Sequence, residues 1–197
     1  MLDAMAHAVA EKGYERTAVA DVVARAGVSR KTFYQQFADK EACFLAAYEA
    51  IFAEIMARVI AAYESRRRWP DRIAAGIAVL LDQLAAEPAY ARAGIVEVLA
   101  AGPRAIELRD ASLRSFQTYF DVSRPEVPEH GAPPIMAEAT IGGIYEVMYR
   151  RIVTDGPETL AGLHPWLTYL ALAPFVGPKA AAKASGLDAS ASSLQSA

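Results

Sequence analysis

The start of the chain alternates apolar and polar residues with the period of a helix. Positions i, i+3, i+4 and i+7 of its apolar face are held by Leu2, Met5, Ala6 and Val9. This spacing predicts an amphipathic helix that ends at Gly13. The same spacing returns after Thr17, which we expect to cap a second helix, and it stops at Gly27. Two short helices are therefore predicted before residue 28.

A third short helix is predicted directly after this turn. Ser29 is suited to cap it, and Phe33 and Phe37, one turn apart, are its expected buried pair. A helix, a turn and a second helix form the arrangement that places a recognition helix in the major groove of DNA. The segment 18–37 is therefore a candidate helix-turn-helix.

The middle of the chain also has helical patterns. Asp39 can cap a helix of about 25 residues that extends to the arginines at 66–68. These arginines are about 38 Å along the helix from its start, so we interpret them as a solvated helix end rather than a phosphate site. Proline is favoured in the first turn of a helix, and four later patterns follow this rule. The helices predicted from them cover residues 70–86, 88–100, 103–121 and 134–154.

Breaks separate these helices and the end of the chain. Residues 123–134 are rich in proline and are predicted to form a loop. A second break at 155–157 leads through a short turn to a last long helix near 164–175, and Pro178 can start a brief end helix. From Ser185 onward the sequence is of low complexity, so we predict a disordered tail over 185–197.

The composition agrees with a helical, globular protein. Hydrophobic residues make up 54% and charged residues 22% of the 197 residues, and alanine is abundant. We therefore predict an all-α fold.

Charge and cysteine content limit the possible partners. Twenty basic and 23 acidic residues give a net charge of −3, so binding to nucleic acid must be local. Cys43 is the only cysteine, which excludes an internal disulfide and fits a reducing cytoplasm; burial is its expected role. No apolar run approaches the roughly 18 residues of a membrane helix, so we expect a soluble protein without a membrane partner.

The exposed face of the predicted third helix carries residues that suit DNA. With Phe33 and Phe37 turned inward, Lys31 and Gln35 lie on the opposite side. Lysine and arginine can bind phosphates or guanine, glutamine can pair with adenine, and tyrosine can donate to phosphate. The face contains no acid. A purely structural pair of helices with a solvated face is the alternative interpretation.

Residues 11–44, EKGYERTAVADVVARAGVSRKTFYQQFADKEACF, resemble the DNA-binding domain of the TetR (tetracycline repressor-like) family of bacterial transcription regulators. The features that carry the resemblance are Gly13-Tyr14, Thr17, Val19, Asp21-Val22, Ala26-Gly27-Val28-Ser29, Phe33-Tyr34, Phe37 and Lys40-Glu41. The stretch from Gly142 to Gly177 resembles, far less specifically, the dimerising end of some members. The resemblance implies an all-α homodimer in which a DNA-binding domain, residues 1–45, packs on a larger helical domain, residues 46–184, that binds a ligand and forms the dimer.

The resemblance also implies which residues contact DNA. The expected contacts are Thr17, Arg30, Lys31, Thr32, Tyr34, Gln35, Gln36 and Lys40. Thr17 is expected to lie near phosphate as the cap of the second helix. Ala18 and Ala20 replace the polar residues of many members, which reduces the contacts expected from that helix. Met1 falls inside the expected first helix without the usual basic leader, which indicates a shortened or misassigned start.

Aromatic residues and methionine on two helices can line a ligand cavity. They are Phe116, Tyr119, Phe120, Tyr145, Met148 and Tyr149. They suit a mainly apolar or aromatic effector that carries a few polar groups. The same residues can equally form an ordinary helical core, because periodicity does not separate the two uses.

The sequence offers no catalytic or metal site. The three histidines, His7, His130 and His164, have no glutamate or histidine partner at metal-binding helical spacing. No nucleophile elbow or phosphate-binding loop is present. We therefore predict no enzyme activity and no cofactor.

These observations favour a cytoplasmic transcription regulator. It is expected to be a homodimeric repressor, built through residues 134–154 and 164–175, that leaves a palindromic DNA operator when a small molecule binds. The alternative is a helical ligand-binding or carrier protein whose DNA-binding domain no longer functions. The ligand, the operator, the regulated genes and the choice between repression and activation are not readable from the sequence.

Overall fold

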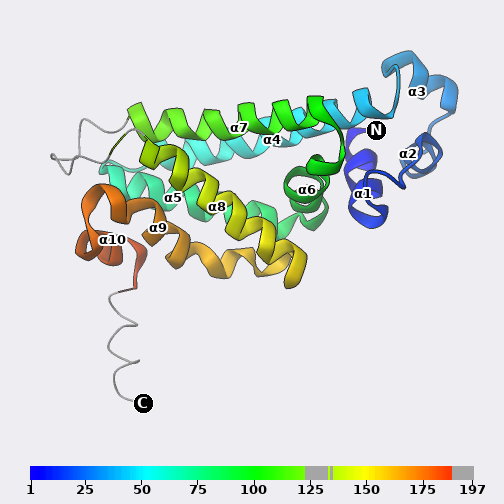
Figure 1. Ribbon diagram of the computed structural model, residues 1–197. Helices are drawn as coiled ribbons and strands as arrows, with labels where there is room; N and C mark the ends of the chain where they lie inside the picture. Colours follow the sequence, from blue (N-terminus) through cyan, green and yellow to red (C-terminus); the bar gives the residue numbers. More distant parts are fainter. Residues whose placement is uncertain (123–132, 134, 188–197) are drawn as a thin grey trace.

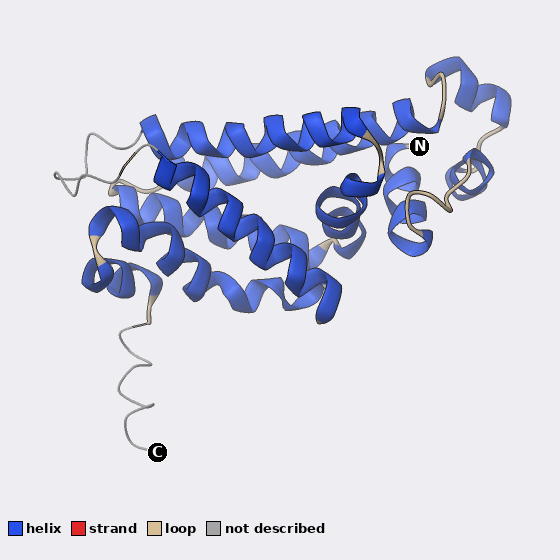
Figure 2. Cartoon of the chain, viewed as in Figure 1, coloured by secondary structure: helices blue, strands red, loops and turns tan. Residues whose placement is uncertain are grey.

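The computed structural model describes residues 1–122, 133 and 135–187, and these residues form helices and turns without a strand (Figure 2). The helices follow one another as α1 (Leu2–Lys12), α2 (Val19–Ala26), α3 (Arg30–Gln36), α4 (Lys40–Glu64), α5 (Trp69–Ala86), α6 (Pro88–Ala91), α7 (Pro103–Val122), α8 (Ile135–Thr154), α9 (His164–Val176) and α10 (Pro178–Ser185). A π-helical segment, η1 (Arg92–Val96), and a 3-10 segment, η2 (Glu97–Ala100), join α6 to α7, and η4 (Pro157–Leu163) precedes α9. The predicted all-α fold is confirmed.

Local capping chemistry explains where the first helices begin and end. The Ser29 hydroxyl accepts the Thr32 N–H at 3.0 Å, and the Asp39 carboxylate accepts the Ala42 N–H at 2.7 Å. Both predicted caps are confirmed. Gly27 ends α2 with a φ of 67°, a left-handed conformation that glycine adopts without steric cost.

The predicted cap at Thr17 is wrong. Helix α2 begins after Ala18, whose N–H donates to the Asp21 carboxylate at 2.8 Å. The Thr17 side chain is buried instead, and its hydroxyl lies 3.2 Å from the Ala8 carbonyl and 2.8 Å from the Gly13 carbonyl. A buried hydroxyl needs a hydrogen-bond acceptor, and these two carbonyls provide it.

The predicted continuous helix over 88–100 is also corrected. The α-helix lasts only four residues, and the chain then widens into η1 and tightens into η2. Gly94 lies inside η1, where the absence of a side chain lowers the resistance to a change of helix type. The Ile95 carbonyl accepts the Tyr145 hydroxyl at 2.7 Å, and this long-range bond favours the altered backbone.

Most of the two predicted irregular regions lies outside the described residues. Of the predicted loop over 123–134 only Pro133 is described, and of the predicted tail only residues 185–187 are described. Ser185 still belongs to α10, and its hydroxyl donates to the Ala182 carbonyl at 3.0 Å. Helical structure therefore extends one residue into the predicted tail.

The helices form a small group and a large group that share α4. In Figure 1, α1, α2 and α3 lie at one end of the molecule, and the long α4 runs from them alongside α7 into the group that contains α5, α8, α9 and α10. Buried residues form two clusters, one built mainly from residues 4–48 and one from residues 63–181. The first cluster also takes in side chains between Ala93 and Ala105, so the α6–α7 connection packs on the small group. The domain boundary at 45/46 stays a prediction, since α4 runs through it.

Among the described residues, no single helix is both long and apolar enough to cross a membrane. Helix α5 and the segment 88–100 together reach the required length and composition, but they are bent by 106° at their break.

Candidate functional site

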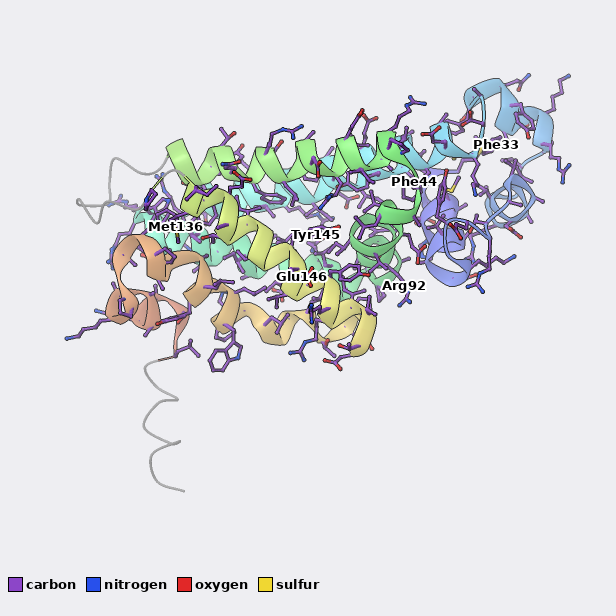
Figure 3. All side chains as sticks on the ribbon, viewed as in Figure 1. Phe33, Phe44, Arg92, Met136, Tyr145 and Glu146 are labelled. Atoms are coloured by element: carbon purple, nitrogen blue, oxygen red, sulfur yellow. The ribbon has the colours of Figure 1, made fainter. Side chains whose placement is uncertain are left out.

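Helix α3 separates a buried side from a polar, exposed side. Phe33 is fully buried and points from α3 into the N-terminal core (Figure 3). Phe37 is only half-buried, because the chain leaves the helix at this residue. Thr32 is half-buried, and the exposed predicted contact residues are Arg30, Lys31, Tyr34, Gln35 and Gln36. This arrangement matches the helical wheel predicted from the sequence, except for Phe37.

The exposed side of α3 carries uncompensated positive charge. Residues 1–47 contain six basic and six acidic residues, so the small group of helices has no net charge. Two ion pairs neutralise acidic side chains of α1 and α2. Lys12 pairs with Asp21 at 2.5 Å, and Arg25 pairs with Glu11. Arg30 and Lys31 have no ion-pair partner in the part of the chain that the structure describes. Positive potential is therefore concentrated on the proposed DNA-facing side.

Tyr34 adds a large exposed ring to this surface. Its exposed fraction is 57%, and its ring packs edge-on against Phe33 at 5.4 Å between centroids. The phenol hydroxyl is therefore held outward on a rigid ring, which suits a contact with a phosphate.

Lys40 and Thr17 have internal roles that the sequence did not reveal. The Lys40 ammonium donates to the Tyr14 carbonyl at 2.8 Å and lies 4.1 Å from the centre of the Tyr14 ring. Desolvation lowers the pKa of Lys40, with Glu15 acting in the opposite direction. Two N–H donors of this ammonium remain for a phosphate. The hydroxyl of Thr17, in contrast, is buried and engaged inside the core, so we leave Thr17 out of the proposed contact set.

The larger group of helices encloses an apolar cavity of about 160 Å³. Its walls come mainly from α4, α5, α7 and α8, and α1, α6 and the connection after α6 contribute the remaining residues. On α4 the wall runs from Phe44 to Tyr63, which is about 28 Å along the helix. The cavity is thus long and narrow, and most of its wall is aliphatic or aromatic.

Five of the six predicted pocket residues line this cavity: Phe116, Tyr119, Phe120, Tyr145 and Met148. Tyr149 does not line it. Whether any of them touches a ligand stays a prediction. The sequence did not identify the opposite wall, which α4 and α5 supply through Ile51, Phe52, Ile55, Ile77 and Leu80. Their spacing is that of any buried helix face, so no sequence signal separates wall from core.

Hydrogen bonds join the wall of the cavity to the small group of helices. Tyr145 points from α8 to the connection after α6 (Figure 3), where its hydroxyl donates to the Ile95 carbonyl of η1. Glu97 follows η1 directly, and its carboxylate accepts the Tyr14 N–H at 2.8 Å. Tyr14 also accepts the Lys40 bond at the start of α4. These bonds place η1 between the cavity and the helix-turn-helix.

A second connection lies at the other end of this segment. Tyr90 of α6 lines the cavity, and its hydroxyl donates to the Asp3 carboxylate in α1 at 3.0 Å. The Tyr90 ring also meets the His7 ring edge-on at 6.1 Å. A displacement of α6 or η1 would therefore act on α1, on which α2 packs.

Helices α8 and α9 carry several exposed large apolar side chains, together with the exposed Glu146–Arg150 ion pair of α8. The apolar side chains are Ile135, Val147, Val153, Trp166 and Leu170, with exposed fractions between 37% and 59%. Gly143 of α8 lies beside Leu170 of α9, and a Cβ at Gly143 would be in ordinary van der Waals contact with the Leu170 side chain, at 3.8 Å. An exposed apolar surface of this kind is typical of a protein interface.

The described residues contain no group of three or more histidine, cysteine, aspartate or glutamate side chains that could hold a metal ion. His164 lies 3.1 Å from the Ala74 carbonyl, and His7 pairs with Asp3 of its own helix. Cys43 is buried, and this burial raises the pKa of its thiol to about 11. Such a thiol is a core side chain rather than a reactive one.

The N-terminal part of the chain matches a known protein family. Residues 1–47 match the family described as bacterial regulatory proteins, tetR family. No curated protein sequence matches the chain.

Solved structures resemble the chain over most of its length. The transcriptional regulator FadR of Bacillus subtilis, in complex with stearoyl-CoA, has 19% identity and a TM-score of 0.78, covering 88% of this chain and 97% of its own. The fatty acid degradation regulator FadR of Bacillus halodurans has 17% identity and a TM-score of 0.78, covering 87% and 95%. SmeT, the repressor of a multidrug efflux pump of Stenotrophomonas maltophilia, has 20% identity and a TM-score of 0.72, covering 89% and 88%. These likenesses establish the fold.

Proposed function

We propose that this chain is a homodimeric repressor of the TetR family that is released from its operator by a small molecule. The match of residues 1–47 to bacterial regulatory proteins of the tetR family supports this proposal. The observation that carries the proposal is the bonded path from the cavity through η1 to the helix-turn-helix. A DNA-binding transcriptional regulator of this kind works on the chromosome, so the proposed location is the cytoplasm.

The proposed DNA contacts come from the exposed side of α3 and the start of α4. They are Arg30, Lys31, Thr32, Tyr34, Gln35, Gln36 and Lys40. Thr32 is tied to Ser29, with 2.9 Å between the two hydroxyl oxygens, so it presents its methyl group rather than a free hydroxyl. Arg30 and Lys31 supply the charge that attracts phosphate.

Lys31→Ala and Tyr34→Phe are each expected to weaken operator binding by roughly 1–3 kcal/mol, because each removes one contact from an exposed side chain. The melting temperature should change little. Fluorescence anisotropy on the DNA upstream of the chain's own gene measures the affinity, and thermal unfolding measures the stability. Arg67→Ala, an exposed arginine at the far end of α4, is the matched control and should bind like the wild type. Unchanged affinity in both variants would remove α3 from the DNA interface.

The dimer we propose joins the exposed faces of α8 and α9 from two copies of this chain. One short recognition helix reads too few bases for specific binding, and a two-fold axis doubles the site. Ala139, Gly142 and Gly143 on α8 permit close approach of the helix backbones. The operator is then nearly palindromic, with half-sites about 34 Å apart.

The effector we propose is a compound with a long apolar chain. The cavity is long, narrow and mostly aliphatic, so it suits an alkyl chain better than a compact sugar or nucleotide. FadR of Bacillus subtilis, which shares the fold, was solved with stearoyl-CoA, and that complex supports an acyl chain here.

Binding of such a chain requires the helices around the cavity to move apart. The cavity volume of about 160 Å³ is below the roughly 300–1,000 Å³ of ordinary ligand pockets. A bound chain would therefore favour a conformation with a wider cavity, in which α6 and η1 are displaced. In that conformation the two recognition helices of the dimer would no longer match successive major grooves. The operator affinity falls a hundredfold if the effector binds this conformation more tightly than the DNA-binding one by about 2.7 kcal/mol.

Phe116→Trp tests the cavity directly. Phe116 meets Phe52 edge-on at 5.9 Å inside the cavity, so a larger ring there reduces the space for a chain. We expect about tenfold weaker binding of long-chain compounds in calorimetry, with operator binding retained. Tyr149→Trp, on α8 but outside the wall, is the matched control and should bind the chain normally. If Phe116→Trp binds and responds like the wild type, the effector site lies elsewhere.

A further inference from the structure

The end of the cavity beside the DNA-binding helices carries a group of polar side chains, which we call the polar station. Tyr48, Ser112 and Tyr145 all line the cavity there, on α4, α7 and α8. The adjoining stretch of α4, from Ile51 to Ile60, contributes only apolar side chains to the wall. A chain-like ligand therefore meets this polar station at one end, apolar side chains along α4, and Tyr63 and Tyr119 toward the opposite end.

Arg109 is not part of the cavity wall, but it lies directly behind this station. It precedes Ser112 and Leu113 by one helical turn, and these residues line the cavity, so Arg109 lies on the same side of α7. Its guanidinium lies 5.2 Å from the centre of the Tyr145 ring. Burial raises the pKa of Tyr145 to about 12 and also raises that of Tyr48, while the Arg109 charge acts in the opposite direction on both. The distance places the cation beside Tyr145, which lines the cavity.

The hydrogen bonds of this station are incomplete on the cationic side. The Tyr145 hydroxyl donates to Ile95, and the Ser112 hydroxyl donates to the Leu108 carbonyl at 3.0 Å. The Arg109 guanidinium forms an ion pair with Asp110 at 3.0 Å and acts as a hydrogen-bond donor toward Tyr145, but its Nε is buried without a partner. A buried cationic donor without an acceptor costs free energy, which an anionic acceptor would recover.

Asp110, the ion-pair partner of Arg109, would compete only weakly with a bound carboxylate. The Asp110 side chain is 43% exposed, and a partly exposed ion pair of neighbouring residues contributes little. The guanidinium can turn from Asp110 toward the cavity and meet a carboxylate through two parallel N–H donors.

We propose that Arg109 binds the carboxylate of the effector, which makes the effector a free long-chain carboxylic acid. This inference rests on the proposed chain-binding cavity and names the chemistry of its polar end. The carboxylate would lie beside Tyr145, whose hydroxyl holds η1, so the acid head would act on the same segment that connects the cavity to the helix-turn-helix.

Binding of matched lipids tests the inference. Tetradecanoic acid, tetradecanol and tetradecanoyl-CoA share one chain and differ in the head, and calorimetry near neutral pH gives the affinity of each. The wild-type protein should bind the acid about tenfold or more tightly than the alcohol, because a charge-assisted hydrogen bond is added. Arg109→Met should abolish this preference and keep the affinity for the alcohol, which also shows that the variant is folded. The acid, more than the alcohol, should release operator DNA from the wild type.

Arg72→Met is the matched control at the opposite end of the cavity. The Arg72 guanidinium lies 5.4 Å from the ring of Tyr63, which lines that end, so it is the competing place for an acid head. Loss of the acid preference in Arg72→Met but not in Arg109→Met would overturn the inference. Equal binding of acid and alcohol, or tightest binding of the CoA thioester with no effect of Arg109→Met, would also overturn it while leaving the chain-binding cavity intact. If none of the three lipids binds, the proposed chain effector fails together with the inference.

Discussion

Replacing Leu170 with glutamate should convert the protein into monomers and lower operator affinity about a hundredfold or more. Leu170 is 38% exposed on α9, one turn after Trp166, which is 59% exposed. In the proposed dimer these side chains are covered by the partner copy, and a buried carboxylate without a cation is strongly unfavourable. Each monomer would then bind one half-site without the help of the second.

Analytical ultracentrifugation gives the oligomeric state, and fluorescence anisotropy on the palindromic operator gives the affinity. Lys179→Glu is the control, because it introduces the same charge on the exposed surface of α10. It should remain dimeric and bind DNA. A Leu170→Glu protein that stays dimeric would move the interface away from α9.

Replacing Phe33 with alanine should lower the free energy of unfolding by about 3–5 kcal/mol and abolish operator binding. Phe33 is fully buried, and its ring meets Phe37 at 5.6 Å and Tyr34 at 5.4 Å. The helix has only seven residues, which is too short to form without tertiary packing. Removal of its one fully buried aromatic side chain would therefore release α3 from the core.

Urea denaturation followed by circular dichroism measures this loss. Tyr34→Ala is the matched control, since it removes the adjacent aromatic ring from a position that is 57% exposed. Its stability should change by less than about 1 kcal/mol, and its main effect should be on DNA affinity. Similar destabilisation of the two variants would mean that the inside and outside of α3 are assigned wrongly.

The helix-turn-helix was readable from the sequence because its determinants are local. Ser29 and Asp39 cap N–H groups three residues away, and Gly27 ends α2 through its own backbone conformation. The spacing of Phe33 from the polar residues of α3 decides which side faces outward. The resemblance of residues 11–44 to TetR regulators then supplied the expected function.

Only part of the cavity wall could be predicted from the sequence. Five aromatic residues and one methionine on α7 and α8 were predicted to line it, and all of them except Tyr149 do so. The wall from α4 and α5 was missed, because a residue that lines a cavity and one that fills a core have the same hydrophobicity and spacing.

The sequence by itself determined the all-α class, most helix ends and the polar side of α3, since these depend on residues within a few positions of one another. Only the tertiary structure decided how the two parts are joined. The Tyr145 hydroxyl donates to the Ile95 carbonyl, 50 residues away in the sequence, and the Tyr14 N–H donates to the Glu97 carboxylate, 83 residues away. The Thr17 hydroxyl is buried and donates to the Ala8 carbonyl of α1. Such partners are chosen by packing of distant helices, and local spacing contains no information about which distant carbonyl or carboxylate will lie within hydrogen-bond distance.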